Sequence, residues 1–118
     1  MSLVVRAFPV LPGKEEAVRQ FADALAGSQQ QEASAFFRRF GIRRESWHLQ
    51  HTPHGVWVIA VTELGDAPEA IAPAYAASQH PFDRWFKDQV CEVCGVNPDE
   101  EPLGPPTEPL FSWDGREG

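Results

Sequence analysis

A predicted β-hairpin at residues 43–63 constrains the fold of this chain more than any other feature. Its two halves, 43–51 and 56–63, read as strands and flank Thr-Pro-His-Gly, which has the Pro and Gly of a tight turn. Because strand side chains alternate, pairing residue 51 with residue 56 divides them between two faces. One face carries Glu45, Trp47, Leu49, Val58 and Ala60. The other carries Ser46, His48, Gln50, Trp57, Ile59 and Val61.

Large apolar side chains therefore lie on both faces of the hairpin. An antiparallel sheet with helices on one side ordinarily exposes a polar second face. An apolar second face predicts another covering layer, and a second copy of the chain is the simplest supplier. We expect a homodimer.

The order of the other elements predicts a ferredoxin-like fold. Residues 3–8 read as a strand, 14–26 and 29–40 as helices, 82–94 as a helix that begins at His80-Pro81, and 110–113 as a brief final strand. A further helix is expected to begin at Asp66 and to be kinked or shortened by Pro73. The order β, α, β, β, α, β predicts an α+β fold with a four-stranded antiparallel sheet.

Length and charge limit the class of protein. The 118 residues suit a single domain, 1–118. No apolar run approaches the roughly 20 residues that cross a bilayer, and no basic-then-apolar leader opens the chain, so we expect a cytoplasmic protein without membrane contact. Much of the net charge of −7 comes from residues 97–118, of which 97–109 is also rich in proline. The nearly neutral body does not favour nucleic-acid binding.

The element order, the hairpin rich in Trp and His, and the stretch His-Pro-Phe-Asp-Arg-Trp-Phe at 80–86 resemble the dimeric α+β barrel superfamily. That superfamily includes antibiotic-biosynthesis monooxygenase-like and stress-responsive barrel proteins, and the chain is most similar to uncharacterised bacterial members. The resemblance covers about residues 3–113. It implies two sheets packed face to face, with a small hydrophobic ligand or haem between sheet and helices. The function that it implies is a monooxygenase-like enzyme for a small aromatic molecule, a non-catalytic ligand-binding or stress-response module, or a haem-binding protein.

Two histidines are the candidate catalytic residues. His48 lies mid-strand on the face that carries Trp57, where neighbours readily move a His pKa, so it is a candidate general base. The alternative is a core histidine bonded to the backbone or to Gln50. His80 precedes Pro81 at a helix N-terminus, where the dipole favours a neutral ring. The resemblance implies that a histidine near this junction lines the ligand cavity, and the alternative is a simple N-cap.

Five residues are candidates for substrate binding: Arg6, Trp47, Trp57, Arg84 and Trp85. Arg6 is the lone charge of its strand, so it either pairs with a carboxylate such as Glu45 or Glu63 or binds an anionic ligand. Arg84 faces a pocket or bridges to an acid of the partner chain. The tryptophans either stack on a flat substrate or belong to the core.

The remaining polar patterns indicate structural roles. Asp83 and Lys87 have the i, i+4 spacing of a surface ion pair. Cys91 and Cys94 come at a helix end before Gly95, where the dipole disfavours thiolate, and no second Cys pair completes a zinc site. Phosphate-binding loops and nucleophile elbows are missing from the sequence. We expect neither a cofactor nor a metal.

Overall fold

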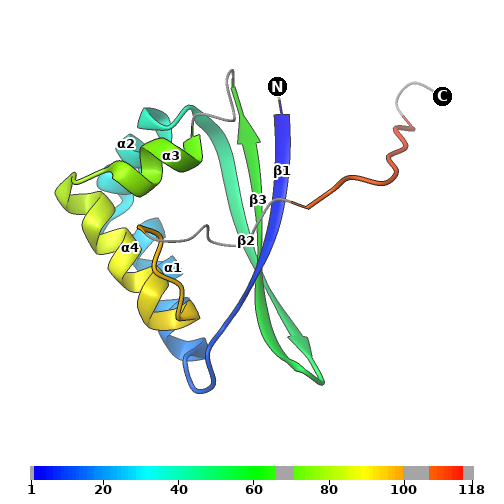
Figure 1. Ribbon diagram of the computed structural model, residues 1–118, viewed down its shortest axis with the longest axis horizontal. Coiled ribbons are helices and arrows are strands. Elements are labelled where there is room, and N and C mark those ends of the chain that lie inside the picture. Colours follow the sequence, from blue (N-terminus) through cyan, green and yellow to red (C-terminus); the bar gives the residue numbers. More distant parts are fainter. Residues whose placement is uncertain (1, 66–70, 100–106, 116–118) are drawn as a thin grey trace.

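Helices lie against one face only of a three-stranded antiparallel sheet in the computed structural model (Figure 1), which describes residues 2–65, 71–99 and 107–115. The elements are β1 (Ser2–Pro9), α1 (Glu15–Ala26), α2 (Gln30–Arg39), β2 (Ile42–Thr52), β3 (Gly55–Leu64), α3 (Ile71–Ala77) and α4 (Pro81–Cys94). The strand order is β1-β3-β2, so the second strand of the hairpin occupies the centre of the sheet.

The hairpin has the predicted register. His51 pairs with Val56, and Thr52 pairs with Gly55 across the turn, where the Thr52 hydroxyl donates to the Gly55 carbonyl (2.8 Å). Trp47 and Ala60 face the helices, whereas His48 and Ile59 face the other way. The predicted division of the hairpin into two faces is therefore confirmed.

The prediction of a fourth strand is wrong for the part of the chain that the structure describes. Residues 110–113 form no strand, and their large apolar side chains are exposed. One backbone hydrogen bond, from Thr107 N–H to the Val5 carbonyl (2.9 Å), joins this segment to the edge of β1. Pro109 then follows, and because proline has no N–H it cannot continue a ladder.

The helix boundaries follow the signals in the sequence. α4 begins where expected, since the His80 imidazole accepts a hydrogen bond from the Phe82 backbone N–H (3.2 Å) and Pro81 takes the first helical position. It ends at Gly95, which has the left-handed conformation (φ 75°). The expected helix start at Asp66 lies outside the described residues, and α3 is described as a short helix of seven residues that contains Pro73.

The core lies between the sheet and the helices. An aromatic cluster joins α1, α2 and α4, and its centre is a stacked pair, Phe36 and Phe86, with ring centroids 4.7 Å apart. A second cluster packs Phe8 and Val58 of the sheet against Val18 and Val93. The opposite face of the sheet carries no helix among the described residues (Figure 1). No described helix has the length and apolarity that a membrane span needs.

Candidate functional site

A cavity of about 370 Å³ lies between the sheet and the helices. Its walls are mainly aromatic and aliphatic, and include Phe8, Phe21, Phe36, Trp47 and Phe86. This volume is in the range of small-molecule sites. The sheet supplies the floor, so alternate residues of the strands decide which polar groups enter the cavity.

The polar groups of the cavity come mainly from the sheet. Glu45 and Thr62 are paired across β2 and β3, and Arg6 enters from β1. The Glu45 carboxylate accepts a hydrogen bond from the Thr62 hydroxyl (2.5 Å) and another from Trp47 Nε1 (2.8 Å). We call Arg6, Glu45, Thr62 and Tyr75 the polar lining of the cavity. These residues bring polar atoms into a cavity whose other walls are mainly apolar.

Burial raises the pKa of Glu45 above its ordinary value. The hydrogen bonds from Thr62 and Trp47 and the positive charge of Arg6 oppose this effect without cancelling it. A carboxyl whose pKa is raised toward neutrality is a better general base when ionised and a usable acid when protonated. Glu45 therefore has the properties of a proton-transfer group.

Tyr75 of α3 is the second unusual group. Its hydroxyl is buried and has no hydrogen-bond partner among the described residues. Burial raises the pKa of Tyr75, and the negative charges of Asp83 and Asp99 raise it further, so the hydroxyl stays a neutral donor. A buried polar atom without a partner is rare in folded proteins and calls for an explanation. A ligand in the cavity would supply the missing acceptor.

Arg6 does not form either of the ion pairs that the sequence suggested. Within the described ranges no carboxylate lies at ion-pair distance from Arg6, although Arg6 acts on Glu45 at longer range. Glu63 pairs with Leu3 and so belongs to the opposite face of the sheet. Arg6 instead lines the cavity with a charge that a ligand oxygen could meet.

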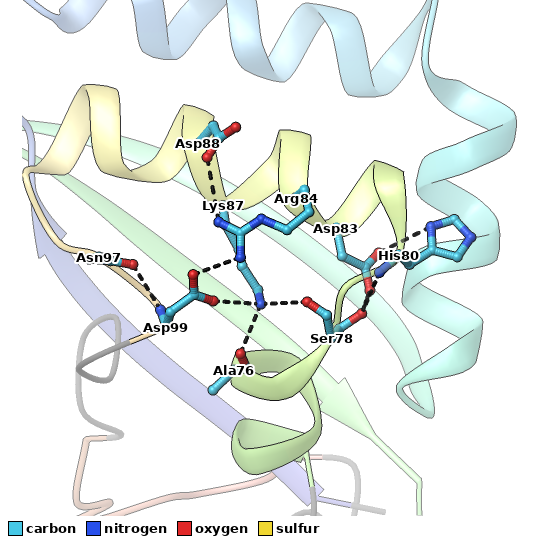
Figure 2. A network of polar contacts seen from close by, with 9 residues as sticks. All are labelled: Ala76, Ser78, His80, Asp83, Arg84, Lys87, Asp88, Asn97 and Asp99. Carbon is cyan, nitrogen blue, oxygen red and sulfur yellow. Dashed lines mark hydrogen bonds and ion pairs between the residues drawn. The ribbon is translucent and has the colours of Figure 1, made fainter.

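A network of hydrogen bonds and ion pairs links α4 to the end of α3 and to Asp99 (Figure 2). Lys87, only 1% exposed, donates to the carbonyls of Ala76 and Ser78 (both 3.0 Å) and to Asp99 (2.9 Å). Asp99 and Ala76 both line the cavity. Lys87 therefore fixes the end of α3 and the segment around Asp99 as parts of the cavity wall.

The prediction that Asp83 and Lys87 form a surface pair is wrong. Asp83 is fully buried, and it binds Arg39 of α2 through two hydrogen bonds (2.7 and 2.8 Å) and the Ser78 hydroxyl (2.5 Å). Burial opposes ionisation of Asp83, but the hydrogen bonds from Arg39 and Ser78 outweigh it, so its pKa lies below the ordinary value. The i, i+4 spacing puts both residues on the same face of α4, but that face is buried rather than exposed to solvent.

Arg84 does not line the cavity, and both of its carboxylate partners among the described residues belong to its own chain. It donates to Asp99 (2.6 Å) and lies 3.6 Å from Asp88. Trp85 packs in the aromatic cluster, with its ring centroid 5.5 Å from that of Phe21. Arg84 therefore holds Asp99, and Trp85 packs against Phe21, and both of these partners line the cavity.

The two candidate catalytic histidines are not brought together. His48 is exposed on the sheet face opposite the helices, with Ser46 Oγ 3.1 Å from its Nε2, and Trp57 lies on the same face. His80 caps α4, and its side chain is 46% exposed. Neither imidazole lines the cavity. Arg6 and Trp47 are the sequence candidates that do, and catalytic roles for the histidines stay predictions.

The two cysteines are free thiols at the end of α4. Cys91 is exposed and Cys94 is buried against the cavity. Burial raises the pKa of Cys94 to about 12, so this thiol remains protonated at neutral pH. It contributes apolar surface to the cavity rather than a nucleophile.

Comparison with known proteins identifies the family of the chain. Residues 1–107 match the model of DUF6176, described as a family of unknown function. The chain belongs to the DUF6176 family. Among curated proteins, none matches this DUF6176 chain. Among solved structures it is similar to L-rhamnose mutarotase FA22100 from Formosa agariphila, with a TM-score of 0.66 and 17% identity over 97% of this chain and 100% of that one.

The likeness to the mutarotase supports the fold. It agrees with the ferredoxin-like α+β architecture that the sequence of this DUF6176 protein predicted, although with three strands instead of four. At 17% identity it does not establish an activity. The comparisons give no support for the monooxygenase-like branch of the resemblance.

Proposed function

We propose that this DUF6176 protein is a cofactor-free acid–base enzyme that moves a proton on a small, largely apolar molecule. The observation that carries the proposal is the polar lining of the cavity. It includes the buried carboxyl of Glu45, whose pKa is raised, and the unpartnered hydroxyl of Tyr75, and the other walls are apolar. Active sites concentrate such perturbed groups in concave pockets. A purely structural cavity has no need of them.

In the proposed reaction, ionised Glu45 takes a proton from a carbon atom beside a carbonyl group of the substrate. Tyr75 donates a hydrogen bond to the carbonyl oxygen, and Arg6 stabilises the negative charge that grows there. The proton then returns at a second position, so the product is an isomer and no electrons are lost. The aromatic walls hold the apolar body of the substrate and exclude water. Mutarotation, for which the solved neighbour is named, opens and recloses a sugar ring with the help of proton transfers and without oxidation or reduction, and this supports acid–base chemistry.

Oxygenation is the second candidate, because an aromatic-lined cavity also suits a substrate whose deprotonated form reacts with O₂. Consumption of dissolved oxygen during turnover would favour it over isomerisation. Haem binding is less favoured, since neither His48 nor His80 lines the cavity. A non-catalytic binding module would use the same cavity without proton exchange.

The exchange of hydrogen for deuterium tests the proposal. β-Tetralone, a flat apolar ketone with acidic hydrogens beside its carbonyl, is incubated with the protein in D₂O, and loss of its α-hydrogen signal is followed by NMR. L-Rhamnose is run in parallel, with anomer exchange as the readout. We expect accelerated exchange on β-tetralone that disappears when the protein is unfolded. Rates equal to those of buffer for both probes would refute the proposal.

Replacing Tyr75 by Phe should stabilise the fold and impair exchange. The variant removes a buried hydroxyl without a partner, whose burial costs about 1 kcal/mol or more, and keeps the ring, over which Lys87 Nζ lies 5.4 Å from the centroid. The denaturant midpoint should rise while exchange on β-tetralone falls. A lower midpoint would mean that the hydroxyl has a structural partner.

We also propose a homodimer in which a second copy covers the sheet face opposite the helices. That face, the open face, carries the apolar side chains of Val5, Trp57, Ile59 and Val61, and each of them is only half-buried. Two copies related by a two-fold axis would cover each other's open face.

Replacing Ile59 by Asp should separate the two copies. It places a charge at the middle of the apolar open face, and sedimentation velocity should then find a single chain where the wild type is a dimer. Gln50→Asp, at an exposed position of the same face, is the matched control and should remain dimeric. A dimer that tolerates Ile59→Asp would show that another surface joins the copies.

A further inference from the structure

The C-terminal arm, residues 107–115, has apolar side chains that contact little of their own chain. Leu110 is 90% exposed, Phe111 86% and Trp113 80%. Figure 1 shows the arm leaving the body beside β1 and pointing away from both sheet and helices. Three large apolar side chains gathered on one projecting segment are typical of an interaction surface.

The arm begins at the margin of the open face. The hydrogen bond from Thr107 N–H to the Val5 carbonyl fixes its start against β1, and Val5 belongs to the open face. From there, nine residues in extended form reach at most about 30 Å. Three strands spaced by about 4.8 Å are narrower than this, so the arm is long enough to cross a sheet.

We propose that the arm of each copy crosses to the second copy and packs Leu110, Phe111 and Trp113 on that copy's open face. This proposal rests on the proposed homodimer and adds that the arm supplies part of the interface. Each chain carries both an exposed arm and an open face. In a two-fold pair each arm would pack on the open face of the other copy, so the same contact forms twice.

The charges of the two surfaces agree with this arrangement. The arm contains the acids Glu108 and Asp114, whereas Arg44 stands at one end of the open face, opposite Glu63. Acidic residues of an arm that reaches the second copy would meet this arginine at the margin of the interface. The alternative, in which the arm folds back over its own open face, is separated by the experiment below.

The test compares dimer dissociation constants by sedimentation velocity over a dilution series. The double variant Phe111→Asp with Trp113→Asp removes the apolar contacts of the arm, and Ser112→Ala, at an exposed position of the same segment, is the control. Because both replaced side chains are exposed, the circular dichroism spectrum should not change. We expect the dissociation constant of the double variant to rise by at least about 100-fold and that of the control to change little.

Each other outcome overturns the proposal in a different way. An unchanged constant means that the arm contributes nothing to the dimer. A lower constant means that the arm covers its own open face and competes with the second copy. A wild type that stays a single chain at every concentration removes the homodimer, and the exchanged arm with it.

Discussion

Glu45→Gln should lower catalysed exchange on β-tetralone by about 10²–10⁴-fold, the range over which a general base contributes. The amide keeps the size of the carboxyl but cannot take the proton. Its carbonyl oxygen can still accept from Trp47 Nε1, and its NH₂ can donate to the Thr62 hydroxyl, so both groups that hold residue 45 in place keep a hydrogen bond. The loss should therefore appear in turnover rather than in folding.

The matched control for this variant is Glu63→Gln. Glu63 lies on the neighbouring strand, next to Thr62, but its side chain belongs to the open face. Exchange by this control should equal that of the wild type. Equal loss in both variants, or none in Glu45→Gln, would remove Glu45 as the base.

Asp83→Asn should produce the largest loss of stability, about 3 kcal/mol or more in the free energy of unfolding. Asp83 is fully buried, and it joins α4 to α2 through two hydrogen bonds from Arg39. The asparagine leaves the guanidinium without its charge partner. The loss should fall at the low end of the range for buried pairs, because Arg39 is 36% exposed and water can still reach it.

Urea unfolding at neutral pH measures this effect, with Asp88→Asn as the control on an exposed turn of the same helix. The difference between wild type and Asp83→Asn should also depend on pH. The pKa of Asp83 is lowered in the folded state, so its stabilisation is complete well above 3.8, the ordinary value, and is lost as the pH falls through the folded-state pKa. A difference that persists in strong acid would show that packing, not charge, holds Asp83.

The local elements of this fold were predictable because local physics determines them. The hairpin register follows from a two-residue turn and from alternating side chains, and the start of α4 follows from His80-Pro81. The fourth strand was not predictable in the same way. Residues 110–113 have strand-forming side chains, but a strand needs a partner, and Pro109 interrupts the ladder where one would begin.

The candidate site was only partly predictable. Arg6 and Trp47, two of the sequence candidates, line the cavity, because strand alternation puts both on the sheet face that the helices cover. Glu45 shares that face, and its position two residues from Trp47 was the available signal for it. Tyr75 had no such signal, since its orientation depends on how Lys87 binds the end of α3. Pairings between distant elements, such as Arg39 with Asp83, decide these placements.

The pH dependence of β-tetralone exchange tests the role of Glu45 most directly. We predict that the rate rises with pH through a single ionisation whose pKa lies above 4.5, the ordinary value for Glu, because Glu45 must be ionised to act and burial raises its pKa. The same ionisation should be missing from Glu45→Gln. A wild-type rate that does not change with pH, or a midpoint below 4.5, would contradict the proposed acid–base chemistry of the cavity.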